Sequence, residues 1–158
     1  MNHSKLNLEE ANKATVRRIY QECLNQGNLE VADQLIAPGY VNQSANGGTG
    51  PESFKEMANH LRSAFPDIHF TIHDLIAEND RVVVSWTWEG THQGRFNQFS
   101  PTGKRVQQEG NVIYRLEGEK VVDVKVQVDR FGFLQQLGVI PQTIASPAGA
   151  GPTRPQAR

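Results

Sequence analysis

The hydrophobic pattern of this chain changes its period half-way along, and that change limits the folds open to it. Up to about residue 65, apolar residues recur every three or four positions, as in amphipathic helices. From about residue 68 they alternate with polar residues, as in strands with one buried face. Helices followed by consecutive strands predict an α+β fold, with N-terminal helices packed on a curled antiparallel sheet. We expect these layers to enclose a cone-shaped pocket, where ligands commonly bind.

The first half predicts three helices. Asn7 can cap the first, which we place over residues 7–26. A short second helix is expected over residues 29–36. Pro51 suits the first position of a third helix that ends before Pro66.

The second half predicts four strands, over residues 68–77, 81–88, 106–116 and 121–129, and a final short helix over residues 131–137. In the last strand, alternation places Val122, Val124, Val126 and Val128 on one face and Asp123, Lys125, Gln127 and Asp129 on the other. Trp86 and Trp88 likewise share one face of the strongest strand.

Composition sets the domain boundaries and excludes several classes of partner. We expect one domain over residues 1–140 and a disordered tail over 141–158, which holds four of the eight prolines. The 16 basic and 17 acidic residues give a net charge of −1, which argues against nucleic-acid binding. No apolar run is long enough for a membrane span, and the polar N-terminus lacks the pattern of a secretory signal, so a cytoplasmic protein is expected. The single cysteine, Cys23, cannot form an internal disulfide.

An ordered series of short segments over about residues 11–140 resembles the SnoaL-like polyketide cyclases, which share the nuclear-transport-factor-2-like and ketosteroid-isomerase-like cone. The segments are residues 16–20, 25–28, 40–43, 65–67, 82–88, 90–94, 101–104, 114–115, 129–132 and 136–138. The resemblance implies intramolecular aldol ring closure of a polyketide ester, with neither metal nor cofactor, in a homodimer or higher homo-oligomer. It also implies that Asp129 is the catalytic aspartate, that His92 is the family's histidine and that Arg115 is structural.

Two positions depart from the family pattern. Gln43 stands where relatives commonly have a histidine, and Lys125 stands where they commonly have a tryptophan. These departures favour an alternative, a small-molecule-binding dimeric module without catalysis. An isomerase, dehydratase or hydrolase on the same cone is a third possibility.

Asp129 has two chemical interpretations. A carboxyl group among apolar neighbours can take up and return a proton near neutrality, as an aldol closure requires, and Asp129 lies between Val128 and Phe131. It also directly precedes the last predicted helix, where it can serve as the N-cap.

The remaining candidates are polar or aromatic residues that can reach a ligand. His92 can donate a hydrogen bond to an enolate oxygen, or simply bond within its loop. The substrate-binding candidates for a small carbonyl compound are Tyr20, Asn42, Gln43, Trp86, Trp88, Lys125 and Gln127. Each has a structural alternative: core packing for the aromatic residues, and solvent contact for the others. No histidine spacing predicts a metal site.

Overall fold

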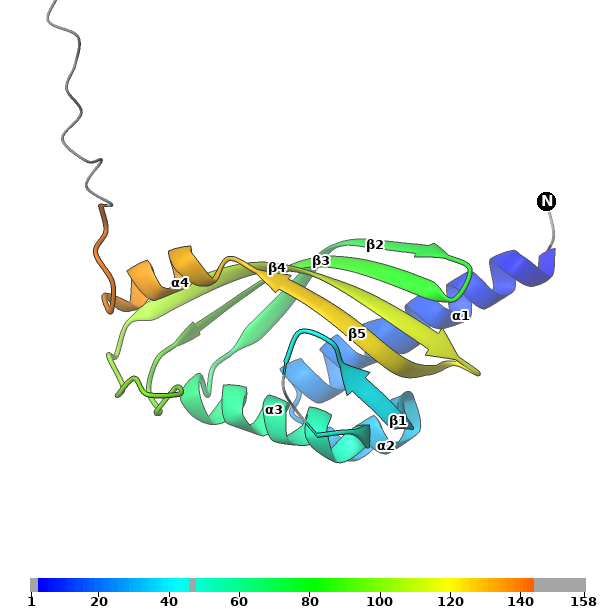
Figure 1. Cartoon of the computed structure of the whole chain (residues 1–158), viewed down its shortest axis with the longest axis horizontal. Helices are drawn as coiled ribbons and strands as arrows, with labels where there is room; N and C mark the ends of the chain where they lie inside the picture. Colours follow the sequence, from blue (N-terminus) through cyan, green and yellow to red (C-terminus); the bar gives the residue numbers. More distant parts are fainter. Residues whose placement is uncertain (1–2, 46–47, 144–158) are drawn as a thin grey trace, which may run out of the picture.

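The computed structural model describes residues 3–45 and 48–143. Within them, four α-helices pack on a five-stranded mixed sheet that is not closed (Figure 1). The elements are α1 (His3–Arg18), η1 (Ile19–Asn25), η2 (Leu29–Val31), α2 (Ala32–Leu35), β1 (Ile36–Asn42), α3 (Gly50–Ala64), β2 (His69–Glu78), β3 (Arg81–Thr91), β4 (Arg105–Glu117), β5 (Lys120–Val128) and α4 (Arg130–Leu137). This confirms the predicted α+β class. The tail from residue 144 onward lies outside the described residues, so its disorder stays a prediction.

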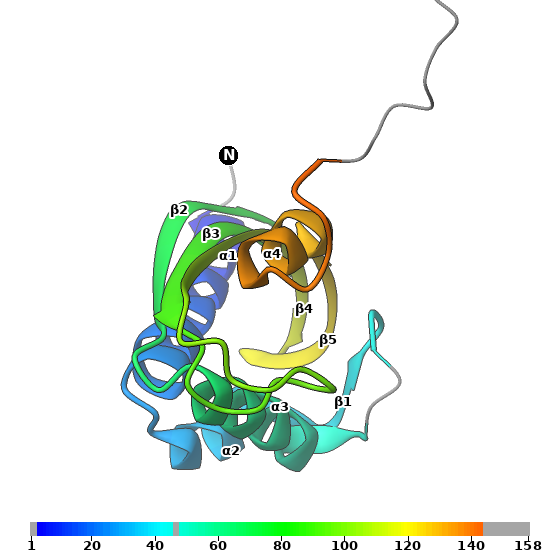
Figure 2. The ribbon, with the colours of Figure 1, turned by 90° about the vertical axis from the view of Figure 1, so that its left-hand side faces the viewer.

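The sheet has the order β1-β5-β4-β3-β2, and it curves around the core (Figure 2). Strands β2 to β5 pair antiparallel, as predicted, but β1 runs parallel to β5. The helix predicted over residues 29–36 is wrong at its end, since Ile36 begins β1. Residues Ile36 and Tyr40 of β1 are buried, and Pro38 is tolerated because β1 is an edge strand.

The first helix begins earlier than predicted and changes its form near its end. Asn7 lies inside α1 and not at its cap, since α1 begins at His3. From Ile19 the helix widens into the π-helical segment η1, which keeps Tyr20, Cys23 and Leu24 buried. The widened segment therefore supplies one wall of the core.

Strand β3 alternates as predicted, with Val82, Val84, Trp86 and Trp88 all buried. Gly110 of β4 pairs with Trp86 across the sheet. A β-carbon on Gly110 would lie 2.5 Å from the Trp86 ring, so glycine makes room for this indole.

Strand β5 contains an irregularity that the simple alternation did not predict. Arg115 pairs with Asp123, but the next residue, Leu116, pairs with Val121, so the register shifts here. Val121 and Val124 are both buried, whereas Val122 is only partly buried. Val122 therefore does not share the inner face with Val124, because the shift breaks the alternation of side chains.

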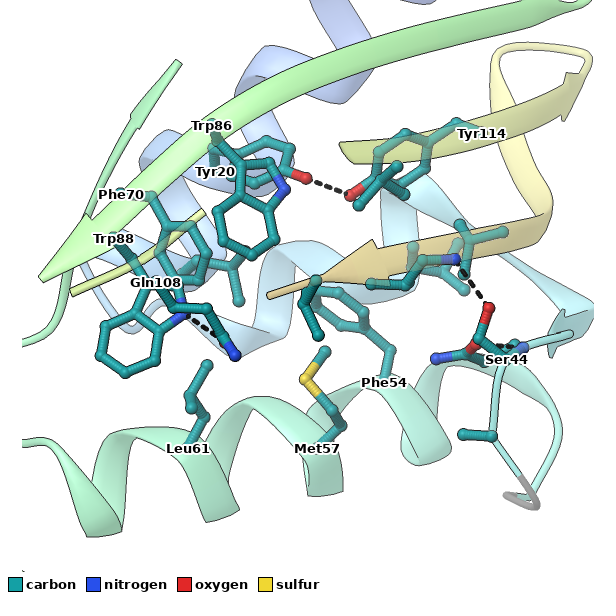
Figure 3. A pocket seen from close by; sticks show the side chains of 18 of the residues that line it. Tyr20, Ser44, Phe54, Met57, Leu61, Phe70, Trp86, Trp88, Gln108 and Tyr114 are labelled. Carbon is teal, nitrogen blue, oxygen red and sulfur yellow. Dashed lines mark hydrogen bonds between the residues drawn. The ribbon is translucent and has the colours of Figure 1, made fainter. Parts of the chain in front are cut away.

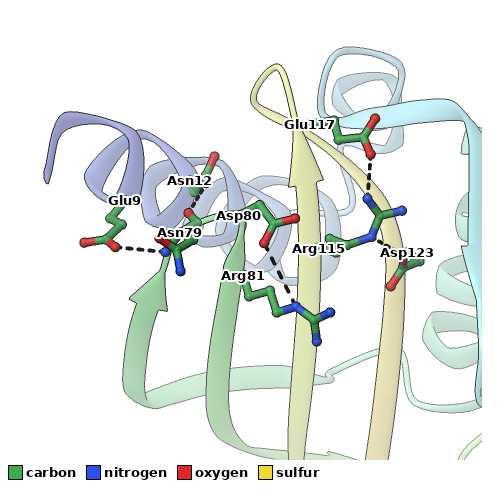
Figure 4. Close-up of polar contacts among 8 residues, drawn as sticks. All are labelled: Glu9, Asn12, Asn79, Asp80, Arg81, Arg115, Glu117 and Asp123. Atoms are coloured by element: carbon green, nitrogen blue, oxygen red, sulfur yellow. Dashed lines mark hydrogen bonds and ion pairs between the residues drawn. The ribbon is translucent and has the colours of Figure 1, made fainter. Parts of the chain in front are cut away.

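Hydrogen bonds and ion pairs stabilise the end of the sheet where the β2–β3 and β4–β5 turns lie (Figure 4). The Asn12 side chain donates to the Asn79 carbonyl oxygen at 3.3 Å, and the Asn79 N–H donates to Glu9 Oε1 at 2.9 Å. These bonds join α1 to the β2–β3 turn. Across β4 and β5, Arg115 Nε donates to Asp123 Oδ2 at 2.6 Å, consistent with the expected structural role of Arg115. None of the described helices is long and apolar enough to cross a membrane.

Candidate functional site

A cavity of about 270 Å³ lies between the inner face of the sheet and helix α3 (Figure 3). Its walls are mainly aromatic and aliphatic. The aromatic lining residues are Tyr20, Tyr40, Phe54, Phe70, Trp86, Trp88 and Tyr114. The polar or charged ones are Asn42, Ser44, Gln108 and Arg130, together with the tyrosine hydroxyls. An apolar chamber with few polar groups suits a small, flat organic ligand.

Tyr20, Tyr114 and Trp86 place their polar atoms close together within this cavity. The Tyr114 hydroxyl donates to the Tyr20 hydroxyl at 2.8 Å, and both groups are buried. In Figure 3 the Trp86 indole nitrogen points towards this pair. The indole Nε1 is buried and makes no hydrogen bond of ordinary geometry with the described residues. An N–H donor without a partner in a buried site is costly, and a ligand oxygen would satisfy it.

The tyrosine hydroxyls remain protonated at neutral pH. Burial raises the pKa of Tyr20, although the nearby Tyr114 and Trp86 groups offset part of this effect. Burial also holds the pKa of Tyr114 well above its usual value and raises that of Tyr40 to about 12. Because Tyr114 donates to Tyr20, the proton of the Tyr20 hydroxyl is available to a ligand.

Other polar lining groups are held by neighbours. Trp88 Nε1 donates to Gln108 Oε1 at 3.2 Å, which fixes the Gln108 amide against the indole. Asn42 Oδ1 accepts from the Ser44 N–H at 2.9 Å, and Ser44 Oγ accepts from the Val126 N–H at 2.7 Å. These bonds hold the segment after β1 against β5. Tyr20, Asn42, Trp86 and Trp88, all predicted from the sequence, thus lie around one cavity.

Asp129 lies beside the cavity but is not among its lining residues. It is exposed, and its Oδ1 accepts from the Gly132 N–H at 2.8 Å, so it caps α4. The capping interpretation is therefore confirmed, while a catalytic role stays a prediction. Its neighbours in the chain, Val128 and Arg130, both line the cavity.

His92 lies outside the cavity lining. Its ring stacks on Phe65, with centroids 5.2 Å apart, and its Nδ1 accepts from the Thr102 N–H at 3.2 Å. The side chain is fully buried and Nε2 makes no hydrogen bond of ordinary geometry with described residues. Burial lowers the pKa of His92, and the nearby Gly94 backbone offsets only part of this effect. The structure thus gives this imidazole a packing position.

Three predicted substrate-binding residues lie elsewhere. Lys125 and Gln127 are exposed, because Val124, Val126 and Val128 of the same strand line the cavity instead. Lys125 and Gln127 on the polar face of β5 were candidates for the pocket wall, whereas the apolar face of β5 lines it. Gln43 borders a shallow depression that also includes Arg115 and Asp123.

Several lining residues were not selected from the sequence. Tyr114, Gln108 and Val112 share one face of β4, so period-two alternation could have identified them. Phe54, Met57 and Leu61 of α3 recur at three- and four-residue spacing, so the helical period could have placed them on one inward face. Arg130 gave no signal, because its position depends on the end of β5. Among residues 3–45 and 48–143, no three histidine, cysteine, aspartate or glutamate side chains are placed to hold a metal ion.

The family profile for the SnoaL-like polyketide cyclases matches residues 14–137. The chain belongs to this family. A provisionally assigned polyketide cyclase from Acidithiobacillus ferrooxidans has 32% identity and a TM-score of 0.73, over 88% of this chain and 99% of that one. IdmH from Streptomyces antibioticus, also a provisional polyketide cyclase, has 26% identity and a TM-score of 0.70, over 80% of this chain and 98% of that one.

A neighbour with a different provisional name is AclR, a hydroxylase from Streptomyces galilaeus. It has 26% identity and a TM-score of 0.74, over 84% of this chain and 99% of that one. No curated protein matches the chain in sequence. Membership of the SnoaL-like family thus fixes the fold and an association with small-molecule substrates, but neighbours with this fold carry names of more than one reaction.

Proposed function

We propose that this SnoaL-like protein closes a ring in a small polyketide-like carbonyl compound by an intramolecular aldol step that requires no cofactor. The observation that carries the proposal is the Trp86 indole N–H, buried and without a described partner, beside the Tyr20–Tyr114 pair. Protonated donors in an apolar cavity can stabilise the negative charge that develops on a carbonyl oxygen during enolisation. Trp86 and Tyr20 would therefore hold that oxygen.

Asp129 is the proposed proton shuttle. Its carboxylate would take a proton from the carbon between two carbonyl groups, and the resulting enolate carbon would attack a third carbonyl carbon farther along the same molecule. The new alkoxide would then recover the proton from Asp129, so the ring closes with no net loss of atoms. Since the carboxylate now caps α4, the step requires it to leave Gly132, at a cost of about 1 kcal/mol.

Binding without chemistry is a second candidate, and one specific observation favours it. Among the described residues, no carboxylate or imidazole lines the cavity, although aldol closure needs a base. Isomerisation, dehydration and hydrolysis need proton transfer as well, so the same observation weighs against them. The decisive comparison is therefore between turnover and simple binding.

The substitution Asp129→Asn separates these functions. Asparagine is as good an N-cap as aspartate, so the fold should persist while the base is lost. We expect turnover of an aryl β-dicarbonyl compound that carries a further ketone along its chain to fall by at least about 100-fold, with the dissociation constant nearly unchanged. Turnover is measured by absorbance of the cyclised product, and binding by quenching of Trp86 and Trp88 fluorescence.

Asp74→Asn is the matched control, because Asp74 is an exposed aspartate of β2 outside the cavity lining, and it should behave as wild type. Equal turnover by the wild type and Asp129→Asn would eliminate the proton shuttle. Tight binding by the wild type with no turnover of any cyclisable compound would favour the binding module.

We also propose that the protein is a homodimer joined through the outer face of its sheet. Ile76, Val83 and Ile113 pair in one row across β2, β3 and β4, and all three are exposed. An exposed apolar row on a sheet face is a common feature of a protein interface. A cytoplasmic location stays a prediction.

A further inference from the structure

A second cavity adjoins the first at the N-terminal end of α4. It has a volume of about 240 Å³ and lies under the short Phe96–Phe99 turn. Gln108, Val128 and Arg130 line both cavities, so the two spaces meet along these three side chains. A ligand longer than the first cavity can therefore extend past Gln108 into the second.

Arg130 is the sole charged residue among the described residues that line these two cavities. It forms no ion pair or side-chain hydrogen bond with any described residue. Arg115, which borders the separate depression near Gln43, differs, since it is bound to Asp123 and Glu117. Asp129, next to Arg130 in the chain, has its carboxylate on the Gly132 N–H and makes no ion pair with Arg130. Arg130 thus lines the ligand space without a charged partner among the described residues.

We infer that Arg130 determines specificity by binding a carboxylate on the substrate of the proposed reaction. The flat apolar part of this substrate would fill the inner cavity, with a carbonyl oxygen at Trp86 and Tyr20. Its carboxylate would lie where the cavities meet. The inference rests on the proposed function, but it replaces the ester that the family resemblance implies with a free acid.

The chemistry of arginine supports this choice of group. A guanidinium presents paired N–H donors that match the two oxygens of a carboxylate, whereas an ester offers no charge and only weak acceptors. Arg130 is exposed, so it keeps part of its hydration in the free protein and needs no buried counter-ion. A carboxylate can then bind it without the cost of burying an unpaired charge.

The test compares a naphthoic acid with its methyl ester, because both are flat and differ in charge. Both tryptophans of the chain line the inner cavity, so their fluorescence reports binding. We expect wild-type protein to bind the acid about 10-fold more tightly than the ester, as for a charge-assisted contact. Arg130→Gln should weaken acid binding about 10-fold and leave ester binding within about twofold.

Arg17→Gln is the control, since Arg17 is exposed on α1, outside both linings and without a described ion pair, and it should keep the preference. Equal binding of acid and ester by the wild type, or an unchanged preference in Arg130→Gln, would overturn the inference. Failure of both probes to bind would overturn the cavity assignment together with it. A preference for the acid in a protein without cyclase activity would support Arg130 while removing the catalytic proposal.

Discussion

Within residues 3–45 and 48–143, two buried side-chain nitrogens, on Trp86 and His92, have no hydrogen-bond partner, and their surroundings differ. Trp86 Nε1 lines the cavity beside two hydroxyls, so a ligand can reach it. His92 Nε2 lies in an aromatic cluster around Phe65, outside that lining. Each unmet donor costs about 1–3 kcal/mol in the free protein. At Trp86 a ligand oxygen can accept the hydrogen bond and remove this cost. At His92 no ligand reaches the ring, and the buried site favours the neutral form of the imidazole.

His92 should make stability depend on pH. Since Nδ1 accepts from the Thr102 N–H, the neutral ring suits the folded protein, and burial lowers its pKa below 6.5. Above pH 6.5 the His92 ring is neutral in both the folded and the unfolded chain. Below pH 6.5 the ring of the unfolded chain becomes protonated, whereas the ring of the folded chain stays neutral. The free energy of unfolding should therefore fall with decreasing pH, by up to about 1.4 kcal/mol per unit, until the pH reaches the folded-state pKa.

Urea unfolding at about pH 7.5 and 5.5 measures this effect, on either side of the unfolded pKa. His92→Asn should be less stable at both pH values but lose less stability between them, while His69→Asn, an exposed change on β2, should keep the wild-type slope. NMR titration of the wild-type ring gives the direct answer. A His92 midpoint at or above 6.5 would contradict the prediction.

At the level of elements, the position of α4 depends on its cap. Asp129 accepts from the Gly132 N–H, and Gly138, with φ of +75°, ends the helix. Asp129→Ala should lower the free energy of unfolding by about 1 kcal/mol, whereas Asp129→Asn should change it by less than half of that. Thermal unfolding followed by circular dichroism measures both variants. If both variants lost the same stability, the carboxylate charge and not the cap would be what stabilises α4.

Elements with strong periodicity were predictable, and irregular ones were not. The alternation in residues 81–88 predicted β3 and placed both tryptophans on one face, which the structure shows to be buried. Strand β1 was missed because Pro38 and Gly39 interrupt a short apolar run and normally indicate a turn. The register shift near Val122 was missed because it depends on pairing with β4.

The candidate site was predictable in part for the same reason. Tyr20 could be placed on the inner stripe of its helix, but its partner Tyr114 is 94 residues away and only the fold joins them. Polar residues of β5 were selected as site candidates because the proposed chemistry needs polar groups. The valines of β5 line the cavity instead, because burying apolar side chains is favourable. The local hydrophobic pattern thus predicted most of the helices and strands. Which of their faces contact one another depends on long-range packing, which the pattern does not contain.

At the scale of the whole molecule, the two faces of the sheet have different roles. The inner face surrounds the cavity, so only the outer face is available for assembly. There the side chains of Ile76, Val83 and Ile113 form a row and are 64%, 38% and 38% exposed. On the next strand, β5, Ile113 pairs with Lys125, so the apolar row ends at a charged residue. If this row forms the dimer interface, a charge at its centre must be desolvated on association, which is unfavourable.

We therefore expect Val83→Glu to weaken dimerisation by at least about 30-fold, equivalent to about 2 kcal/mol. Light scattering on a size-exclusion column should give the mass of two chains for the wild type and of one chain for Val83→Glu. Leu8→Glu places the same charge on an exposed apolar site of α1 and should remain dimeric. Because Val83 does not line the cavity, Val83→Glu should still bind the flat acid, and loss of binding together with assembly would show that the two faces are coupled.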